Sequence, residues 1–149
     1  MQTDQAVLPQ QKQSTSAARI LVVDDDAAIR KALRMVLEDE GYLVSEAQDG
    51  VRALEYLRSC VEPVVVLLDF MMPRMDGAAV LRAVVEDTRL ATRNAYVLVS
   101  ANYNTIARSC ASLLASLNVP VLPKPLDLDD LLETVQEEME RVAPRPALH

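Results

Sequence analysis

Residues 64–73 read VVVLLDFMMP, and this stretch carries the clearest indication of the fold class. The five residues 64–68 form an apolar run that does not alternate with polar residues. Such a run is typical of a strand in a parallel sheet that is covered on both faces. Asp69 follows the run directly, so a carboxylate stands where the predicted strand ends.

The same pattern recurs outward along the chain. Residues 20–23 (ILVV) and 96–99 (YVLV) are further apolar runs, whereas residues 43–47 and 119–122 are more mixed and suit edge strands. The segments between these runs have apolar residues at helical spacing. The predicted helices contain residues 29–37, 51–57, 80–85, 106–117 and 128–139. Five strands alternating with five helices predict one α/β domain, a doubly wound five-stranded parallel sheet of (βα)5 type.

Composition narrows the function classes. The chain has 149 residues and a formal net charge of −7, which disfavours direct binding to nucleic acid or to an anionic membrane. The two cysteines, Cys60 and Cys110, are too few for a disulfide framework, so we expect reduced thiols. No signal peptide and no membrane span is visible, so we expect a cytoplasmic protein. We expect a single domain over residues 18–141, between a disordered tail at 1–17 and a second tail at 142–149.

Polar residues with linked chemistry follow four of the predicted strands. Asp24 and Asp25 follow the first, Asp69 the third, Ser100 the fourth and Lys124 the fifth. In open α/β sheets the functional crevice lies outside the carboxyl ends of the strands, so these groups are expected to converge. Carboxylates crowded in a small site need a proton or a cation among them, and Mg²⁺ with oxygen ligands is the natural partner. A carboxylate there can act as a nucleophile toward phosphorus, beside a charge-neutralising lysine.

These stretches resemble the response-regulator receiver domains of two-component signalling. The resemblance rests on residues 20–26 (ILVVDDD), 65–77 (VVLLDFMMPRMDG), 99–101 (VSA) and 124–125 (KP), and it covers roughly residues 19–140. It implies a flavodoxin-like, chemotaxis-regulator-like fold with strand order 2-1-3-4-5. The roles it implies are phosphoacceptor for Asp69, Mg²⁺ ligands for Asp24, Asp25, Asp69 and the Met71 carbonyl, and phosphoryl binding for Ser100 and Lys124. The resemblance also implies a cis peptide bond between Lys124 and Pro125, while Asp26 is left outside the site as a helix cap.

The resemblance further implies a phosphorelay switch rather than an enzyme. The expected partners are a sensor histidine kinase or a His-phosphotransfer protein, and a downstream protein that the sequence does not identify. The only expected chemistry is Mg²⁺-dependent self-phosphorylation from a phosphodonor and slow autodephosphorylation. Slow loss is expected because Met71 and Asn102 occupy the positions that tune phosphoryl lifetime, and a methionine cannot orient a water as an amide can. The expected moving surface spans residues 103–141.

One departure keeps alternatives open. Many receivers carry an aromatic residue where this chain has Val121, so we expect altered switching, with Tyr103 as a candidate substitute. A phosphorylation-independent pseudo-receiver that binds partners is the main alternative. A phosphohydrolase is disfavoured because Met71 stands where a second aspartate is usual, and a nucleotide or flavin binder because the three glycines are isolated. A stand-alone receiver and a fragment of a longer regulator both fit the sequence.

Overall fold

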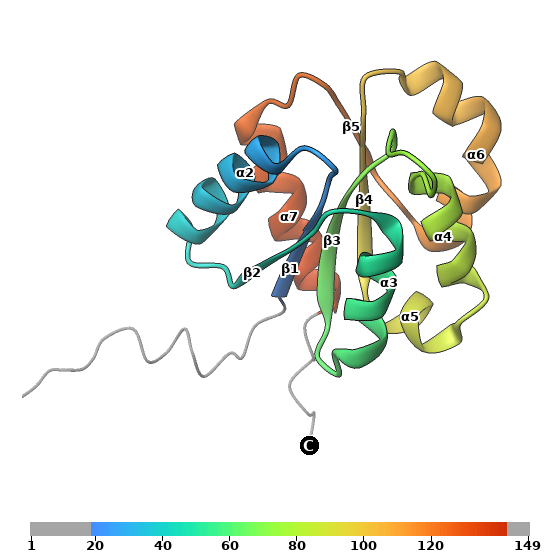
Figure 1. Cartoon of the computed structure of the whole chain (residues 1–149), viewed down its shortest axis with the longest axis horizontal. Coiled ribbons are helices and arrows are strands. Elements are labelled where there is room, and N and C mark those ends of the chain that lie inside the picture. The colour runs from blue at the N-terminus through green and yellow to red at the C-terminus, as the bar shows by residue number, and fades with distance from the viewer. Residues whose placement is uncertain (1–18, 143–149) are drawn as a thin grey trace, which may run out of the picture.

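The computed structural model describes residues 19–142, apart from the side chains of Thr105 and Ala107. Five parallel strands form one sheet in the order β2-β1-β3-β4-β5, which confirms the predicted fold class and strand order (Figure 1). The tails predicted at 1–17 and 142–149 lie outside the described residues, except for Val142, the last residue of the final helix. The elements are β1 (Arg19–Val23), α2 (Ala27–Asp39), β2 (Val44–Ala47), α3 (Gly50–Ser59), β3 (Val64–Asp69), α4 (Gly77–Val85), α5 (Thr88–Arg93), β4 (Ala95–Ser100), α6 (Tyr103–Leu117), β5 (Val121–Pro123) and α7 (Leu128–Val142).

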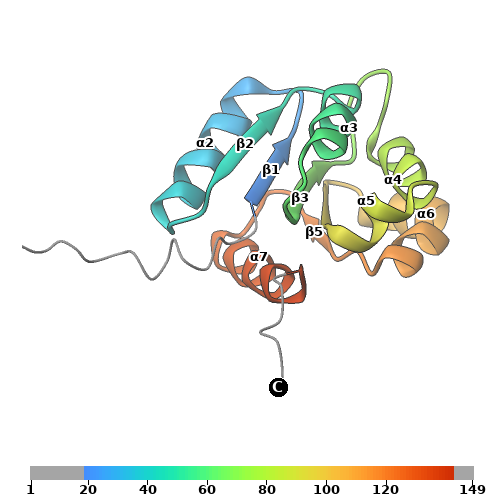
Figure 2. The ribbon, with the colours of Figure 1, turned by 90° about the horizontal axis from the view of Figure 1, so that it is seen from below.

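Helices cover both faces of the sheet. Helices α2 and α7 lie on one face, and α3, α4, α5 and α6 lie on the other (Figures 1 and 2). Alternate residues of one strand therefore join different cores: Leu21 and Val23 pack with the larger helix group, and Ile20 and Val22 with α2 and α7. This explains why the central strands are apolar without alternation, since both of their faces are buried.

The edge strands are β2 and β5, as the mixed runs indicated. Strand β5 begins at Val121, two residues later than the predicted run. Pro120 has no N–H to donate, and its carbonyl instead accepts a hydrogen bond from the Leu98 N–H at 2.9 Å. The buried side chain of Val119 packs in the connection before the strand, which explains why it matched the apolar pattern.

Aspartates cap the amino-terminal ends of most of the described helices. Asp26 caps α2 by accepting hydrogen bonds from the N–H groups of Ala28 and Ile29, which confirms the predicted cap. Asp127 caps α7 in the same way, through the N–H of Asp130 at 3.0 Å. Gly41 follows α2 with φ of 95°, the left-handed conformation that glycine adopts after a helix.

Helix α5 was not predicted. It has six residues, begins after the cap Asp87, and buries only Leu90, so it carries no apolar stripe that helical periodicity can detect. The described helices include none that is long and apolar enough to cross a membrane.

Candidate functional site

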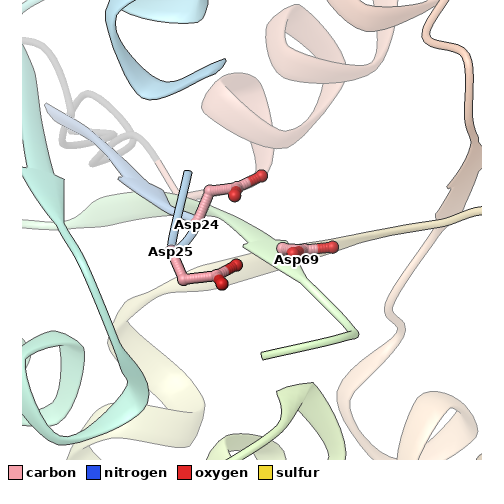
Figure 3. Close-up of side chains that lie close together, drawn as sticks. All are labelled: Asp24, Asp25 and Asp69. Atoms are coloured by element: carbon pink, nitrogen blue, oxygen red, sulfur yellow. The ribbon is translucent and has the colours of Figure 1, made fainter. Parts of the chain in front are cut away.

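Three carboxylates meet at the carboxyl end of the sheet. Asp24 and Asp25 follow β1, and Asp69 ends the neighbouring strand β3. One oxygen from each carboxylate lies within 4.8 Å of the others. Figure 3 shows the three side chains directed into the same space beyond the strand ends. The convergence expected for these three carboxylates is therefore present in the structure.

Lys124 brings an ammonium group to this cluster. Its Nζ donates a hydrogen bond to Oδ1 of Asp69 at 3.1 Å and lies 3.9 Å from Oδ2 of Asp24. Lys124 directly follows β5, and its peptide bond to Pro125 is cis, as the resemblance implied. The lysine therefore reaches two of the three carboxylates from the far edge of the sheet.

Ser100 ends β4 and is buried. Its carbonyl accepts a hydrogen bond from the backbone N–H of Lys124 at 2.9 Å, which ties the ends of β4 and β5 together. Its hydroxyl oxygen accepts a hydrogen bond from the N–H of Asn102 at 3.0 Å. Because Asp69 pairs with Val99 in the sheet register, Ser100 lies one residue beyond the phosphoacceptor candidate on the adjacent strand.

Backbone and side-chain donors hold Asp24 in place. Its Oδ1 accepts a hydrogen bond from the N–H of Asp26 at 2.8 Å. Its main-chain carbonyl accepts a second one from Arg30 Nη1 at 2.7 Å. Arg30 also pairs with Glu46, and sequence reasoning found neither residue because each reads as an ordinary surface charge. Asp26 acts as the cap of α2, and it contributes its N–H rather than its carboxylate to the site.

Burial sets the electrostatics of the site. Burial raises the pKa of Asp69, which the hydrogen bond from Lys124 lowers only in part. Burial likewise raises the pKa of Asp24, opposed by the hydrogen bond from the Asp26 N–H. The protein's own donors therefore do not fully compensate these two carboxylates. Crowded carboxylate oxygens of this kind fit a hard divalent cation, which prefers oxygen ligands.

Gly77 explains part of the motif around Asp69. A Cβ atom at this position would lie 2.9 Å from the Cα of Phe70 and 3.2 Å from the carbonyl oxygen of Asp69. The Gly77 N–H donates a hydrogen bond to the Phe70 carbonyl at 2.8 Å. Glycine thus lets the start of α4 pack directly against the main chain that carries Asp69. Met71, in the intervening loop, exposes 67% of its surface, so its side chain is not held in the site.

An open groove lies away from the acidic cluster, between α6, β5 and α7. It has a volume of about 550 Å³. Tyr103 and Val121 line it, together with Glu138 and Arg141, which form an ion pair at 2.8 Å. Val121 is half-buried, and the Tyr103 side chain is exposed on the groove wall. The two residues singled out in the sequence therefore share one surface.

Comparison with known proteins assigns the family. Residues 20–136 match the family described as "Response regulator receiver domain". The response regulator MprA of a Mycobacterium species is 40% identical over 126 residues, covering 85% of this chain and 52% of that protein. The chain thus spans about half the length of the curated relatives it matches.

Solved structures agree with this match. A CheY-like response regulator receiver domain protein from Methanospirillum hungatei is 32% identical with a TM-score of 0.73, covering 84% of this chain and 96% of that one. The chemotaxis protein CheY4 of Vibrio cholerae is 26% identical with a TM-score of 0.70, covering 82% of this chain and 98% of that one. The chain therefore belongs to the response regulator receiver domains of two-component systems.

Proposed function

We propose that this domain accepts a phosphoryl group on Asp69 in a Mg²⁺-dependent reaction and thereby changes its affinity for a partner protein. Receiver domains are signalling switches rather than enzymes, and they bind Mg²⁺ at an acidic pocket. The observation that carries the proposal is the meeting of Asp24, Asp25 and Asp69 within 4.8 Å, with Lys124 hydrogen-bonded to Asp69. Membership of the family supports the same reading.

The residues present can perform phosphoryl transfer. A carboxylate oxygen of Asp69 attacks the phosphorus of the donor, and the bond from phosphorus to the leaving group breaks, with its electron pair going to the leaving group. The product is an acyl phosphate on Asp69. The Lys124 ammonium offsets charge on the phosphoryl oxygens, and the Ser100 hydroxyl donates a hydrogen bond to one of them.

Mg²⁺ is the cofactor that this site fits. The residues that would hold it are Asp24, Asp25, Asp69 and the carbonyl of Met71. When bound, the ion neutralises charge on the transferring phosphoryl group. The raised pKa values of the buried Asp24 and Asp69 carboxylates support this assignment, because a cation would stabilise their ionised forms.

Ser100 links the site to the proposed switching surface, which consists of α6, β5 and α7. Its hydroxyl oxygen accepts from the Asn102 N–H, one residue before α6 begins. Turning the hydroxyl toward a phosphoryl oxygen would change that contact, and phosphorylation would favour an active conformer already present in the ensemble. The groove of about 550 Å³ on this surface offers a place for the partner to bind.

We propose that Tyr103 takes the role of the aromatic residue that many receivers carry at the position of Val121. It starts α6 and shares the groove wall with Val121. We expect the Tyr103 ring signals in an NMR spectrum to shift on phosphorylation of Asp69. Unchanged signals from this ring would remove Tyr103 from the switch.

The phosphoryl group is expected to be lost slowly. The exposed Met71 side chain has no group that can orient an attacking water beside Asp69. The lifetime of the isolated phosphoprotein, followed by mass spectrometry in the presence of Mg²⁺, tests this expectation. A half-life of seconds would contradict it.

The proposed upstream partner is a sensor histidine kinase or a His-phosphotransfer protein, which would supply the phosphoryl group from a phosphohistidine. The downstream partner is a protein that reads the surface of α6, β5 and α7. Cytoplasmic location is part of the same proposal.

Mass spectrometry of the intact protein, after incubation with acetyl phosphate and Mg²⁺, tests the proposal. The wild type should gain one phosphoryl group, and Asp69→Asn should gain none. Asp87→Asn, which alters the cap of α5 before the amino-terminal end of β4 and not the acidic cluster at the carboxyl ends of the strands, is the matched control and should be phosphorylated like the wild type. An adduct that persists in Asp69→Asn, or a wild type that remains unmodified, would refute the proposal.

A further inference from the structure

Arg30 contacts the main chain beside the acidic cluster. Its Nη1 donates a hydrogen bond of 2.7 Å to the main-chain carbonyl of Asp24. That carbonyl belongs to the peptide group that joins Asp24 to Asp25, the two aspartates that follow β1. Arg30 therefore contacts the peptide group that links the two aspartates.

The guanidinium of Arg30 is itself held from a second side. Its Nε lies 3.0 Å from Oε1 of Glu46, and only 14% of the arginine side chain is exposed. Glu46 lies on β2, opposite Val22 of β1 in the sheet register. The other oxygen of Glu46 pairs with Arg34 Nη1 at 2.9 Å. The guanidinium of Arg30 thus joins helix α2, strand β2 and the loop after β1. Its planar group donates hydrogen bonds from separate nitrogens in fixed directions, which the ammonium of a lysine does not reproduce.

We propose that Arg30, oriented by Glu46, is a positioning residue for the divalent cation: it fixes the peptide group between Asp24 and Asp25 and so tightens Mg²⁺ binding. This inference rests on the proposed function, because it concerns the same metal site. Groups that orient metal ligands through hydrogen bonds typically contribute 10- to 100-fold in metal affinity.

Charge alone predicts the opposite effect. Arg30 is a cation next to a site for another cation, so removing its charge should strengthen Mg²⁺ binding by reducing repulsion. Removing its hydrogen bond to the Asp24 carbonyl should weaken binding by freeing the loop. The sign of the change in dissociation constant therefore separates a positioning role from a simple electrostatic one.

The test is an NMR titration of the wild type and its variants with MgCl₂ in the absence of any phosphodonor. Arg30→Ala should raise the dissociation constant on the order of 10-fold or more. Arg30→Lys keeps the charge but loses the planar guanidinium, so this variant should also bind Mg²⁺ more weakly than the wild type, by a smaller factor. Arg30→Lys decides the matter alone if Arg30→Ala does not fold.

Arg34→Ala is the matched control. It removes the same charge from the same helix and from the same glutamate, but the guanidinium of Arg34 donates to Glu38 and Glu46 rather than to the Asp24 carbonyl. We expect Mg²⁺ affinity equal to that of the wild type or slightly tighter. A merely structural role for Arg30 would lower the midpoint of thermal unfolding of metal-free protein and leave the dissociation constant unchanged.

The outcomes distinguish this inference from the proposed function. A wild type that binds Mg²⁺, with Asp25→Asn that does not, supports the metal site. If Arg30→Lys then binds like the wild type, and Arg30→Ala binds equally or more tightly, the positioning role is overturned and the metal site stands. If the wild type itself does not bind Mg²⁺, both the metal site and the positioning role fail.

Discussion

Buried polar groups at the two ends of the central strands are arranged in opposite ways. At the amino-terminal ends of β3 and β4, the Asn94 side chain accepts from the Val64 N–H at 3.0 Å and donates to the Tyr96 hydroxyl at 3.3 Å. That hydroxyl donates to the Leu90 carbonyl at 2.9 Å. At the carboxyl-terminal ends, buried Asp24 and Asp69 stand together with raised pKa values.

The two ends of the sheet serve stability and function separately. The Asn94 network satisfies its members within the protein, and burial raises the pKa of Tyr96 to about 12 because it disfavours the charged phenolate. The acidic end leaves carboxylates that the protein's own donors do not fully compensate, and it therefore favours an added cation. Removing a member of the Asn94 network should therefore lower stability, whereas removing a group from the acidic end should impair phosphorylation without lowering stability.

The largest expected effect is on phosphorylation. Lys124→Met removes the ammonium that contacts Asp69, and we expect the rate of phosphorylation from acetyl phosphate to fall about 10²-fold. The initial rate of adduct formation, followed by mass spectrometry, measures this. Lys31→Met, the same substitution at an exposed position of α2, should leave the rate unchanged. A Lys124→Met rate close to that of the wild type would remove the lysine from the proposed chemistry.

At the opposite end, the expected effect is on stability. Asn94→Ala leaves the buried Val64 N–H without its acceptor, and we expect the free energy of unfolding to fall by about 1–3 kcal/mol. Urea unfolding measures the change. Asn104→Ala, at an exposed position, should change it by no more than about 0.5 kcal/mol. The comparison breaks if Asn94→Ala instead weakens Mg²⁺ binding and leaves stability intact.

Asp69→Asn should have the reverse effect on stability. Because burial raises the pKa of Asp69, the fold disfavours its ionised form, and a neutral amide removes that cost. We expect a higher midpoint of thermal unfolding than for the wild type, measured without Mg²⁺ at neutral pH. A lower midpoint would mean that the ion pair with Lys124 outweighs the effect of burial.

A smaller effect should appear in how the stability difference between the wild type and Asp69→Asn depends on pH. The raised pKa means that folded protein binds more protons at Asp69 than unfolded protein does, between the ordinary aspartate pKa and the raised value. The stability of the wild type relative to Asp69→Asn is thus greatest below the ordinary value and is lost as pH rises through the raised one. Unfolding of both proteins across this range measures it, and a constant difference would contradict the shift.

The sequence predicts the acidic end well because its signal is local. Four site residues each end or follow an apolar run, and parallel strands bring such positions to one edge of the sheet. These residues are Asp24, Asp69, Ser100 and Lys124. The strand order and the edge strands were also predicted, the order through the resemblance. The domain boundaries and the individual roles of the site residues stay predictions.

The features that the sequence does not predict depend mainly on contacts between residues that are far apart in the chain. Arg30 and Glu46 lie 16 residues apart, on a helix and an edge strand, and nothing in either neighbourhood indicates that they meet beside Asp24. The bonds of Asn94 depend likewise on residues from β3 and β4 that come together only in the folded sheet. Helix α5 was missed because a short, capped helix with one buried side chain leaves no periodic pattern.

In the proposed function, the carboxyl ends of the strands build a divalent cation site beside the phosphoacceptor Asp69. Paramagnetic Mn²⁺, used in place of Mg²⁺, tests it most directly by NMR, because it broadens the signals of nearby nuclei. We expect strong broadening of the amide signals of Asp24, Asp25, Asp69 and Met71, and sharp signals at Asn94. Broadening spread evenly over the acidic surface, or absent from these four residues, would contradict it.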